Sequence, residues 1–226
     1  MTELIDYFKE FVTENKWHLF NQVIEKRTRY ITVVLEDIFQ AQNASAVLRT
    51  CDCFGIQDVH VIENKNEYQV NPDVALGSSK WLNLYKYNEL ENNTLSAINS
   101  LKEQGYRIVA TTPHRNDVEL ESFDLYKGKT ALFFGSELPG LSRLMMENAD
   151  EFMKIPMFGF TESFNISVSA AIILHHLNYE LKKSTIKWEL SESEKDEILL
   201  NWLKTSVKNS DMIEKEYYTR LEKNKL

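Results

Sequence analysis

The sequence has few of the residues that stabilise metal-bound or disulfide-rich proteins, since only two of its 226 residues are cysteines. Cys51 and Cys53 stand two residues apart with no second pair to complete a zinc site, and we interpret them as small packing residues. Basic residues are also few, because 26 Lys and Arg face 34 Asp and Glu and give a net charge of −8. This balance argues against a protein that coats nucleic acid or acidic membranes through bulk charge, but it is compatible with a local basic patch.

Long apolar runs are missing. The run at 170–174 is among the longest, far short of the roughly 20 apolar residues that a membrane helix needs. The first residues are acidic where a signal peptide would be basic, so we expect a cytoplasmic protein with no membrane partner. The P-loop, G-x-G-x-x-G, G-x-S-x-G and H-E-x-x-H motifs are absent, and the histidines show no metal-ligand spacing. We therefore predict no metal site.

Short β-rich runs alternate with helical stretches through the middle of the chain. The predicted strands are 30–35, 59–62, 84–87, 107–111, 130–134 and 152–155, and the predicted helices are 44–54, 92–104, 142–148 and 165–182. This alternation predicts an α/β fold with a mainly parallel sheet and helices on both faces. We expect a helical N-terminal extension at 1–29, a main domain at 30–183 and a helical C-terminal extension at 184–226. Ser191 and Glu194 form a candidate capping box in the last segment.

The loops after three predicted strands are unusual. Residues 112–117, 135–140 and 156–165 are rich in Gly, Pro and polar residues and follow the carboxyl ends of strands. Ligands of open α/β sheets bind at that edge, so these loops are candidates to line a cofactor pocket. The alternative is that they are ordinary turns.

Two helices carry further signals. At 100° per residue, Arg49 falls opposite the apolar face of its helix, beside Ser45, which indicates either a solvated arginine or a guanidinium presented to phosphate. The helix that starts at Asn165 is apolar on two sides, so one side needs a cover such as a second subunit, and we predict a homodimer. Asn165 itself is either a plain N-cap or a ligand-facing residue.

Three segments resemble the motifs of the SpoU (TrmH-type) RNA ribose methyltransferases of the SPOUT superfamily. They are NASAVLRTCDCFG at 43–55, LFFGSELPGLS at 132–142, and IPMFG at 155–159 with SFNISVS at 163–169. The resemblance covers roughly residues 28–182, and 75–81 is also similar to the family. It implies a C-terminal trefoil knot, a dimer through the third-motif helix, and methyl transfer from S-adenosylmethionine to a ribose 2′-hydroxyl.

The resemblance also assigns residues. Arg49 matches the key residue for activating the hydroxyl, and the other matching active-site polar residues are Asn43, Glu137, Ser163 and Asn165. The implied cofactor pocket contains Thr111, Gly135, Gly140, Ile155, Met157 and Phe164. The sequence departs from the family pattern at Phe164, where Leu is usual, and at Leu138-Pro139 after the motif glutamate.

Lys26, Arg27 and Arg29, together with Arg115 and Lys80, are the candidate RNA-binding residues, with a solvated helix end as the alternative for the first three. The terminal helices resemble those of family members that methylate guanosine-18 in the tRNA D-loop, so tRNA is the expected substrate and ribosomal RNA the second choice. A non-catalytic knotted RNA-binding protein is a rival interpretation. A methyltransferase acting on small molecules or proteins is a further one.

Overall fold

The computed structural model describes residues 2–69, 71–115, 117–137 and 139–223. The chain divides into two compact units, which we call the sheet unit, Thr28–Trp188, and the terminal unit, made of the residues up to Arg27 and from Glu189 onward. The two segments expected as separate extensions thus form one unit. No helix of the described residues is long and apolar enough to cross a membrane.

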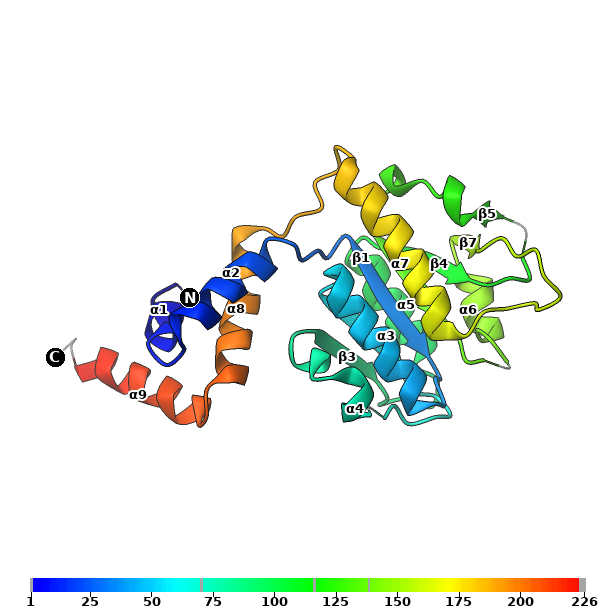
Figure 1. Ribbon diagram of the computed structural model, residues 1–226. Helices are drawn as coiled ribbons and strands as arrows, with labels where there is room; N and C mark the ends of the chain where they lie inside the picture. Colours follow the sequence, from blue (N-terminus) through cyan, green and yellow to red (C-terminus); the bar gives the residue numbers. More distant parts are fainter. Residues whose placement is uncertain (1, 70, 116, 138, 224–226) are drawn as a thin grey trace. The chain divides into compact units, whose positions relative to one another are not determined.

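The sheet unit is built on a seven-stranded sheet in the order β3-β2-β1-β6-β4-β7-β5, shown in Figure 1. Its strands are β1 (Ile31–Glu36), β2 (Asp58–Ile62), β3 (Asn83–Tyr87), β4 (Arg107–Thr111), β5 (Val118–Glu119), β6 (Thr130–Phe134) and β7 (Glu151–Lys154). Every pair of neighbouring strands is parallel, which confirms the predicted parallel sheet. Only the two-residue β5 was not predicted from the sequence.

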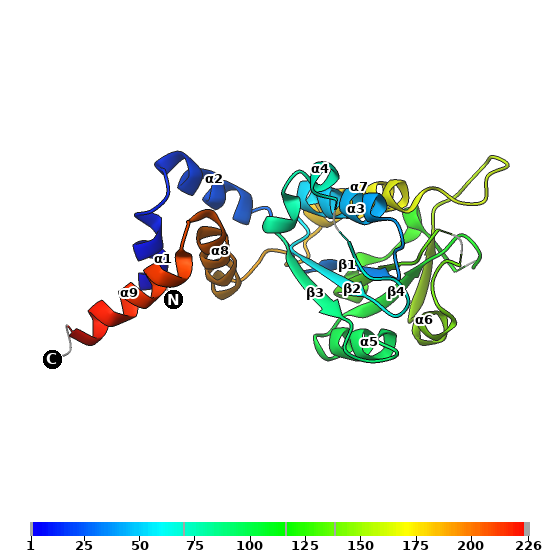
Figure 2. The same cartoon turned by 90° about the horizontal axis from the view of Figure 1, so that it is seen from below.

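Helices cover both faces of this sheet, as Figure 2 shows. On one side lie α3 (Ala41–Phe54) and α7 (Ile166–Lys183), and on the other lie α5 (Thr94–Glu103) and α6 (Arg143–Asn148). Successive side chains of β1 point to opposite faces, so Val33 and Leu35 join the core under α3 and α7 while Val34 joins the core under α5 and α6. This two-sided burial explains the continuous apolar strand. Short turns complete the unit: α4 (Pro72–Ala75), η1 (Ser78–Lys80), η2 (Leu120–Ser122) and η3 (Leu125–Lys127).

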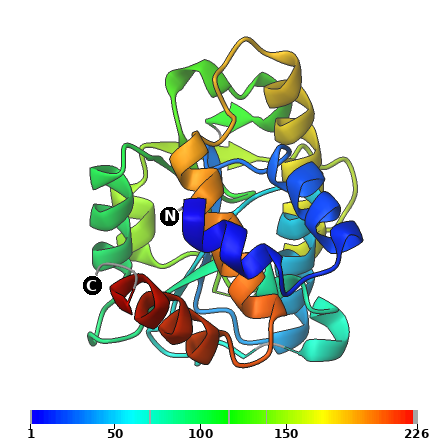
Figure 3. The same cartoon turned by 90° about the vertical axis from the view of Figure 1, so that its left-hand side faces the viewer.

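The terminal unit contains α1 (Thr2–Lys9), α2 (Glu14–Ile24), α8 (Glu192–Ser206) and α9 (Ser210–Lys223), which Figure 3 presents to the viewer. Helices α1 and α2 pack on α8. Phe8, Phe20 and Trp202 are buried in its interior, and the rings of Phe20 and Trp202 have their centroids 5.5 Å apart. The predicted capping box of Ser191 and Glu194 is present at the start of α8.

Candidate active site

A cluster of three polar side chains, one from each motif, lies at the carboxyl edge of the sheet. The Glu137 carboxylate accepts hydrogen bonds from Asn43 Nδ2 and Asn165 Nδ2, each at 2.7 Å and each to Oε1. Asn165 Nδ2 also donates to Asn43 Oδ1 at 3.1 Å. We call Asn43, Glu137 and Asn165 the amide–carboxylate cluster. Asn43 is buried, whereas Glu137 and Asn165 are exposed, so a substrate can reach the cluster.

The parallel topology assembles this cluster. Asn43 lies in the first turn of α3, which follows β1, and Glu137 lies in the loop after β6, the strand next to β1. Asn165 is the N-cap of α7, and its Oδ1 accepts from Ser167 N at 2.8 Å. The N-cap interpretation of Asn165 is therefore confirmed. Capping uses the oxygen of its amide and leaves Nδ2 to hold Glu137.

Two adjoining cavities open beside the cluster, between the loops that follow β4, β6 and β7. The first, about 340 Å³, is lined by Thr111, Ile155, Met157, Ser163 and Phe164 among others. The second, about 660 Å³, adds Gly135, Glu137 and Gly140 and shares Thr111, Ser163 and Phe164 with the first. The structure thus brings every residue assigned to the cofactor pocket, together with Ser163, around one continuous space.

The loop after β6 closes on itself through its two glycines. A Cβ on Gly135 would overlap the backbone of Gly140 and Leu141. Gly140 has a φ of +68°, a conformation that side chains disfavour, and its N–H donates to Ser136 O at 3.0 Å. Both glycines are therefore required by backbone geometry, and the loop presents its main chain to the second cavity.

The sequence departs from the family pattern at Phe164 and at Leu138-Pro139, and the structure describes Phe164 and Pro139. The ring of Phe164 lines both cavities and is 43% exposed. Pro139 lines the second cavity. Leu138 lies outside the described residues.

Sequence reasoning missed the residue that anchors this loop. Glu36, the last residue of β1, is buried and accepts from Thr94 Oγ1 at 2.7 Å, from Ser142 Oγ at 2.7 Å and from Ser142 N at 2.8 Å. Ser142 in turn caps α6, which begins where the loop ends. A carboxylate that ends an otherwise apolar strand was the available signal.

Arg49 lies apart from the amide–carboxylate cluster. It is exposed on α3, as expected, and six residues after Asn43 place it about 9 Å farther along the helix axis. Within the described part of the chain it forms no ion pair. The guanidinium is thus available to an incoming phosphate.

The chain is similar to known proteins in sequence and in fold. The sequence profile of the SpoU rRNA Methylase family matches residues 30–175. This chain belongs to the SpoU rRNA methylase family. It is 47% identical over 210 residues to a tRNA (guanosine(18)-2′-O)-methyltransferase of Borreliella burgdorferi, covering 93% of this chain and 94% of that one. It is 31% identical to the enzyme of the same name from Thermus thermophilus, with 85% and 97% covered.

Solved structures of the family share the fold. The A. aeolicus TrmH/SpoU tRNA modifying enzyme superimposes with a TM-score of 0.75 at 31% identity, covering 86% of this chain and 98% of that one. The SpoU methyltransferase AviRb of Streptomyces viridochromogenes, solved in complex with the cofactor AdoMet, has a TM-score of 0.58 at 20% identity, over 72% and 62% of the two chains. The second likeness supports the fold alone.

The predicted RNA-binding residues differ in their surroundings. Lys26, Lys80 and Arg115 are exposed, and Arg115 lies over the ring of Phe152 at 5.5 Å. Arg27, in contrast, is only 2% exposed, because its guanidinium packs over the Trp202 ring at 5.4 Å. Because Arg27 is buried, it does not lie on a surface that RNA could contact. Its position in a basic run had predicted an RNA-binding residue, and the structure corrects this.

Arg29 is the second correction. Its side chain is largely buried and pairs with Asp58 at 3.0 Å, so its charge is already neutralised inside the sheet unit. A guanidinium bound to an internal carboxylate is a weak phosphate ligand, because binding would require the ion pair to break.

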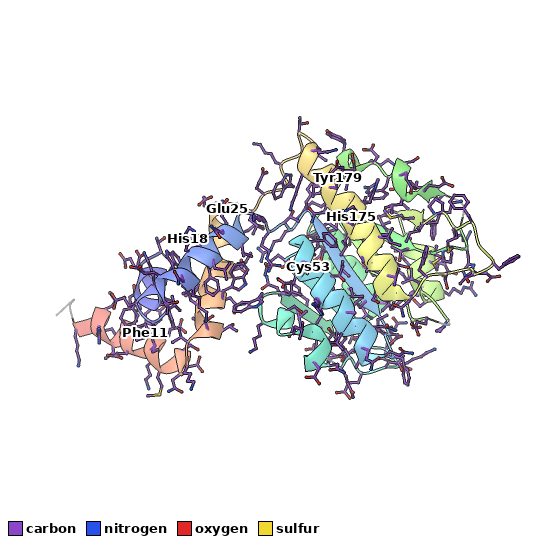
Figure 4. All side chains as sticks on the ribbon, in the orientation of Figure 1. Phe11, His18, Glu25, Cys53, His175 and Tyr179 are labelled. Carbon is purple, nitrogen blue, oxygen red and sulfur yellow. The ribbon has the colours of Figure 1, made fainter. Side chains whose placement is uncertain are left out.

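The outer side of α7 is open, as the two-sided helix predicted. Val168, His175 and Tyr179 are exposed there, and Figure 4 shows His175 and Tyr179 on the same side as Cys53 of α3. The rings of His175 and Tyr179 stack with centroids 6.5 Å apart, and His175 meets Phe54 edge-on at 6.0 Å. No group of three or more metal-ligating side chains occurs among the residues that the structure covers.

Proposed function

We propose that the chain transfers a methyl group from S-adenosylmethionine to the ribose 2′-hydroxyl of guanosine-18 in the D-loop of tRNA. The observation that carries this proposal is the amide–carboxylate cluster at the mouth of the two cavities, in a chain 47% identical to an enzyme of that name. A tRNA substrate implies action in the cytoplasm.

The cavities fit S-adenosylmethionine. Thr111, Ser163 and Phe164 line both cavities, so one elongated ligand can extend from the first into the second. Ile155, Met157 and Phe164 supply an apolar wall for an adenine ring, and the loop that Gly135 and Gly140 fold offers backbone groups to its polar edge. When bound, the cofactor supplies an electrophilic methyl group on a sulfonium sulfur.

The protein must position the 2′-hydroxyl and help it lose its proton as the new carbon–oxygen bond forms. Glu137 is fixed by two amide donors, so its second oxygen, Oε2, is free to accept a hydrogen bond from a ribose hydroxyl. The pKa of an arginine is too high for an easy general base, so we assign Arg49 to holding an RNA phosphate, whose oxygen accepts the proton. Asn43, Ser163 and Asn165 position the substrate.

We further propose that the chain contains the trefoil knot of its family and forms a homodimer through α7. The likeness to the A. aeolicus structure supports the knot. The exposed Val168 and Tyr179 on the outer side of α7 support the dimer, because a second copy would remove them from water. Light scattering at micromolar concentration should give twice the chain mass of 26.5 kDa, and a monomer would contradict the dimer.

RNA binding is assigned to Lys26, Lys80, Arg49 and Arg115, since Arg27 and Arg29 have partners inside the protein. Each phosphate contact makes the binding constant fall as salt rises, with a log–log slope of about −0.7 to −0.9 per contact, so few contacts predict a shallow slope. A very steep slope would contradict this short set of residues.

The second candidate substrate is ribosomal RNA, which the description of the matching family names. Labelled S-adenosylmethionine should be incubated with bulk tRNA and, separately, with ribosomal RNA, and the products digested to nucleosides for mass spectrometry. We expect 2′-O-methylguanosine from tRNA with the wild type and with Lys102→Ala, a charge-matched surface control, and none with Arg49→Ala.

Methylation of ribosomal RNA alone would keep the reaction and overturn the substrate. Cofactor binding without transfer to either RNA would favour the non-catalytic knotted protein.

A further inference from the structure

A third hollow lies next to the amide–carboxylate cluster and has no role in the reaction so far described. It measures about 640 Å³ and is lined by Phe39, Gln40 and Asn66 together with Asn43 and Glu137. Glu137 also lines the second cavity, so one carboxylate stands between the cofactor space and this hollow. A molecule in the hollow would therefore sit within reach of the reacting centre.

Phe39 gives the hollow an aromatic wall. Its side chain is 77% exposed although it lies only three residues after Glu36, the buried end of β1. An exposed aromatic ring beside a polar cluster is a stacking surface for a nucleobase, since proteins that bind unpaired bases place them on such rings.

The part of the lining that Asn66 contributes is held in place by Asp37. This residue adopts a left-handed conformation with a φ of +53°, and its Oδ1 accepts from Asn64 N at 2.8 Å, Lys65 N at 2.8 Å and Asn66 N at 3.4 Å. The loop at 64–66 is thereby tied to the end of β1. A strained residue with three amide donors indicates a wall whose shape is fixed before any ligand arrives.

Two amide side chains give the hollow hydrogen-bonding capacity. Gln40 Oε1 accepts from Asn43 Nδ2 at 3.1 Å, which leaves Gln40 Nε2 as a donor. Asn66 Nδ2 donates to Asp37 O at 3.0 Å, which leaves Asn66 Oδ1 as an acceptor. A donor and an acceptor together can pair with the edge of a nucleobase, and guanine presents an N–H donor as well as a carbonyl acceptor.

We propose that this hollow, which we call the base hollow, binds the guanine of the nucleotide that accepts the methyl group. The ring stacks on Phe39, its polar edge meets Gln40 and Asn66, and the ribose lies against Glu137 between the base hollow and the second cavity. This inference rests on the proposed function and adds to it the element that selects the base.

The test is a double-mutant cycle that combines Phe39→Ala in the protein with removal of the base from the tRNA. The substrates are a tRNA with guanosine at the acceptor position and one with an abasic ribose there, which keeps the 2′-hydroxyl. With guanosine, Phe39→Ala should lower kcat/KM by roughly 5- to 150-fold, the range for loss of one base–aromatic stack. With the abasic tRNA the two proteins should be equal, because the stack is already absent.

Controls separate stacking from folding. Leu90→Ala removes another exposed apolar side chain, 60% accessible, and should leave the rates with both substrates unchanged. Phe39→Trp should restore most of the loss, since tryptophan also stacks. S-adenosylmethionine should bind every variant with wild-type affinity in calorimetry.

The outcomes distinguish the two proposals. If the losses from Phe39→Ala and from the abasic ribose multiply, the base does not contact Phe39 and the base hollow is wrong. If Phe39→Ala changes the oligomeric state, the hollow is a contact between copies, and the inference is again overturned. A wild-type chain that transfers no methyl group to tRNA overturns the proposed function, and this inference with it.

Discussion

The sheet unit and the terminal unit treat polar groups in different ways. In the sheet unit Glu36, Asn43 and His60 are buried and hydrogen-bonded. Within the described part of the terminal unit Arg27 is the one buried polar side chain, and an ion pair such as Lys195 with Glu25, at 2.8 Å, has an exposed partner. Its interior is aromatic and aliphatic.

The two units therefore differ in how closely their interior contacts fix the positions of the surrounding elements. A buried polar group must meet its partners in good geometry, so each one fixes the elements around it. An apolar interior requires that its volume be filled, and several arrangements of contacts can fill it. The sheet unit is therefore suited to position reacting groups, and the terminal unit to pack as a module.

Arg49→Ala should lower the rate of methyl transfer without destabilising the sheet unit. Loss of a group that takes part in proton transfer lowers rates by about 10²–10⁴-fold, so single-turnover methyl transfer should fall by that factor. Because Arg49 is exposed, cofactor affinity and thermal midpoint should stay unchanged. Arg49→Lys, which keeps the charge but not the planar fork, should recover little. A near-normal rate with Arg49→Ala would remove the residue from its role.

Trp202→Ala should damage the terminal unit alone. Removing a fully buried tryptophan destabilises by about 3–5 kcal/mol, and here it also leaves Arg27 without its ring. Hydrogen exchange should rise in α1, α2 and α8, while the sheet unit keeps its protection and its cofactor affinity. The exposed Tyr218→Ala is the matched control. Loss of protection in both units would show that they fold as one.

Acid should destabilise the sheet unit more than the terminal unit. Burial lowers the pKa of His60 from 6.5 to about 4, so below pH 6.5 the unfolded chain binds a proton that the folded chain does not. Stability is then complete above pH 6.5 and falls as the pH drops toward 4, by about 2 kcal/mol between pH 7.5 and pH 5.

Urea unfolding at the two pH values would measure this change. His60→Gln should flatten the pH dependence, whereas His18→Gln, at an exposed position of the terminal unit shown in Figure 4, should not. Equal slopes for wild type and His60→Gln would contradict the assignment to His60.

Glu36→Gln tests whether the buried carboxylate positions the loop after β6, which borders the proposed cofactor cavity. Glutamine cannot accept all three hydrogen bonds from Thr94 and Ser142, and an unsatisfied buried group carries a penalty of about 1–3 kcal/mol. We expect the affinity for S-adenosylmethionine to fall by roughly tenfold, at the lower end of that range. Exposed Glu147→Gln serves as the control. Unchanged affinity with lowered stability would reduce Glu36 to a structural role.

Lys195→Met should have the smallest effect. Its amine contacts Glu25 and Glu192, whose side chains are largely exposed, and such pairs contribute about 0.2–1 kcal/mol. The thermal midpoint should barely move, and high salt should erase the difference from wild type. A large loss of stability would mean that surface charges hold the terminal unit together after all.

Much of the fold was predictable because its signals are local. β4 and β6 have the predicted bounds, 107–111 and 130–134, and α8 begins directly after Ser191 of the predicted capping box. The short β5 was missed because two residues carry no periodicity, and only its pairing with β7 defines it.

The sequence predicted which residues belong to the candidate site but not how they are arranged in space. The motifs named Asn43, Glu137 and Asn165, and the order of the strands brings them together. Helical angles placed Ser45 on the outer side with Arg49, yet Ser45 is fully buried, because Asn71 N donates to its Oγ at 2.7 Å. A helical projection shows which way a side chain points, but not what later segment covers it.

Local sequence patterns were sufficient for the alternation of strands and helices, the motif residues, the two-sided α7 and the exposure of Arg49, since each depends on neighbours in the chain. Contacts between distant segments explain why Glu36 anchors the loop after β6, why Arg27 and Arg29 turn inward, and why Phe39 borders a hollow beside Glu137. These outcomes depend on partners distant in the chain. Burial and pairing of a charge are properties of the surrounding fold, so no local pattern records them.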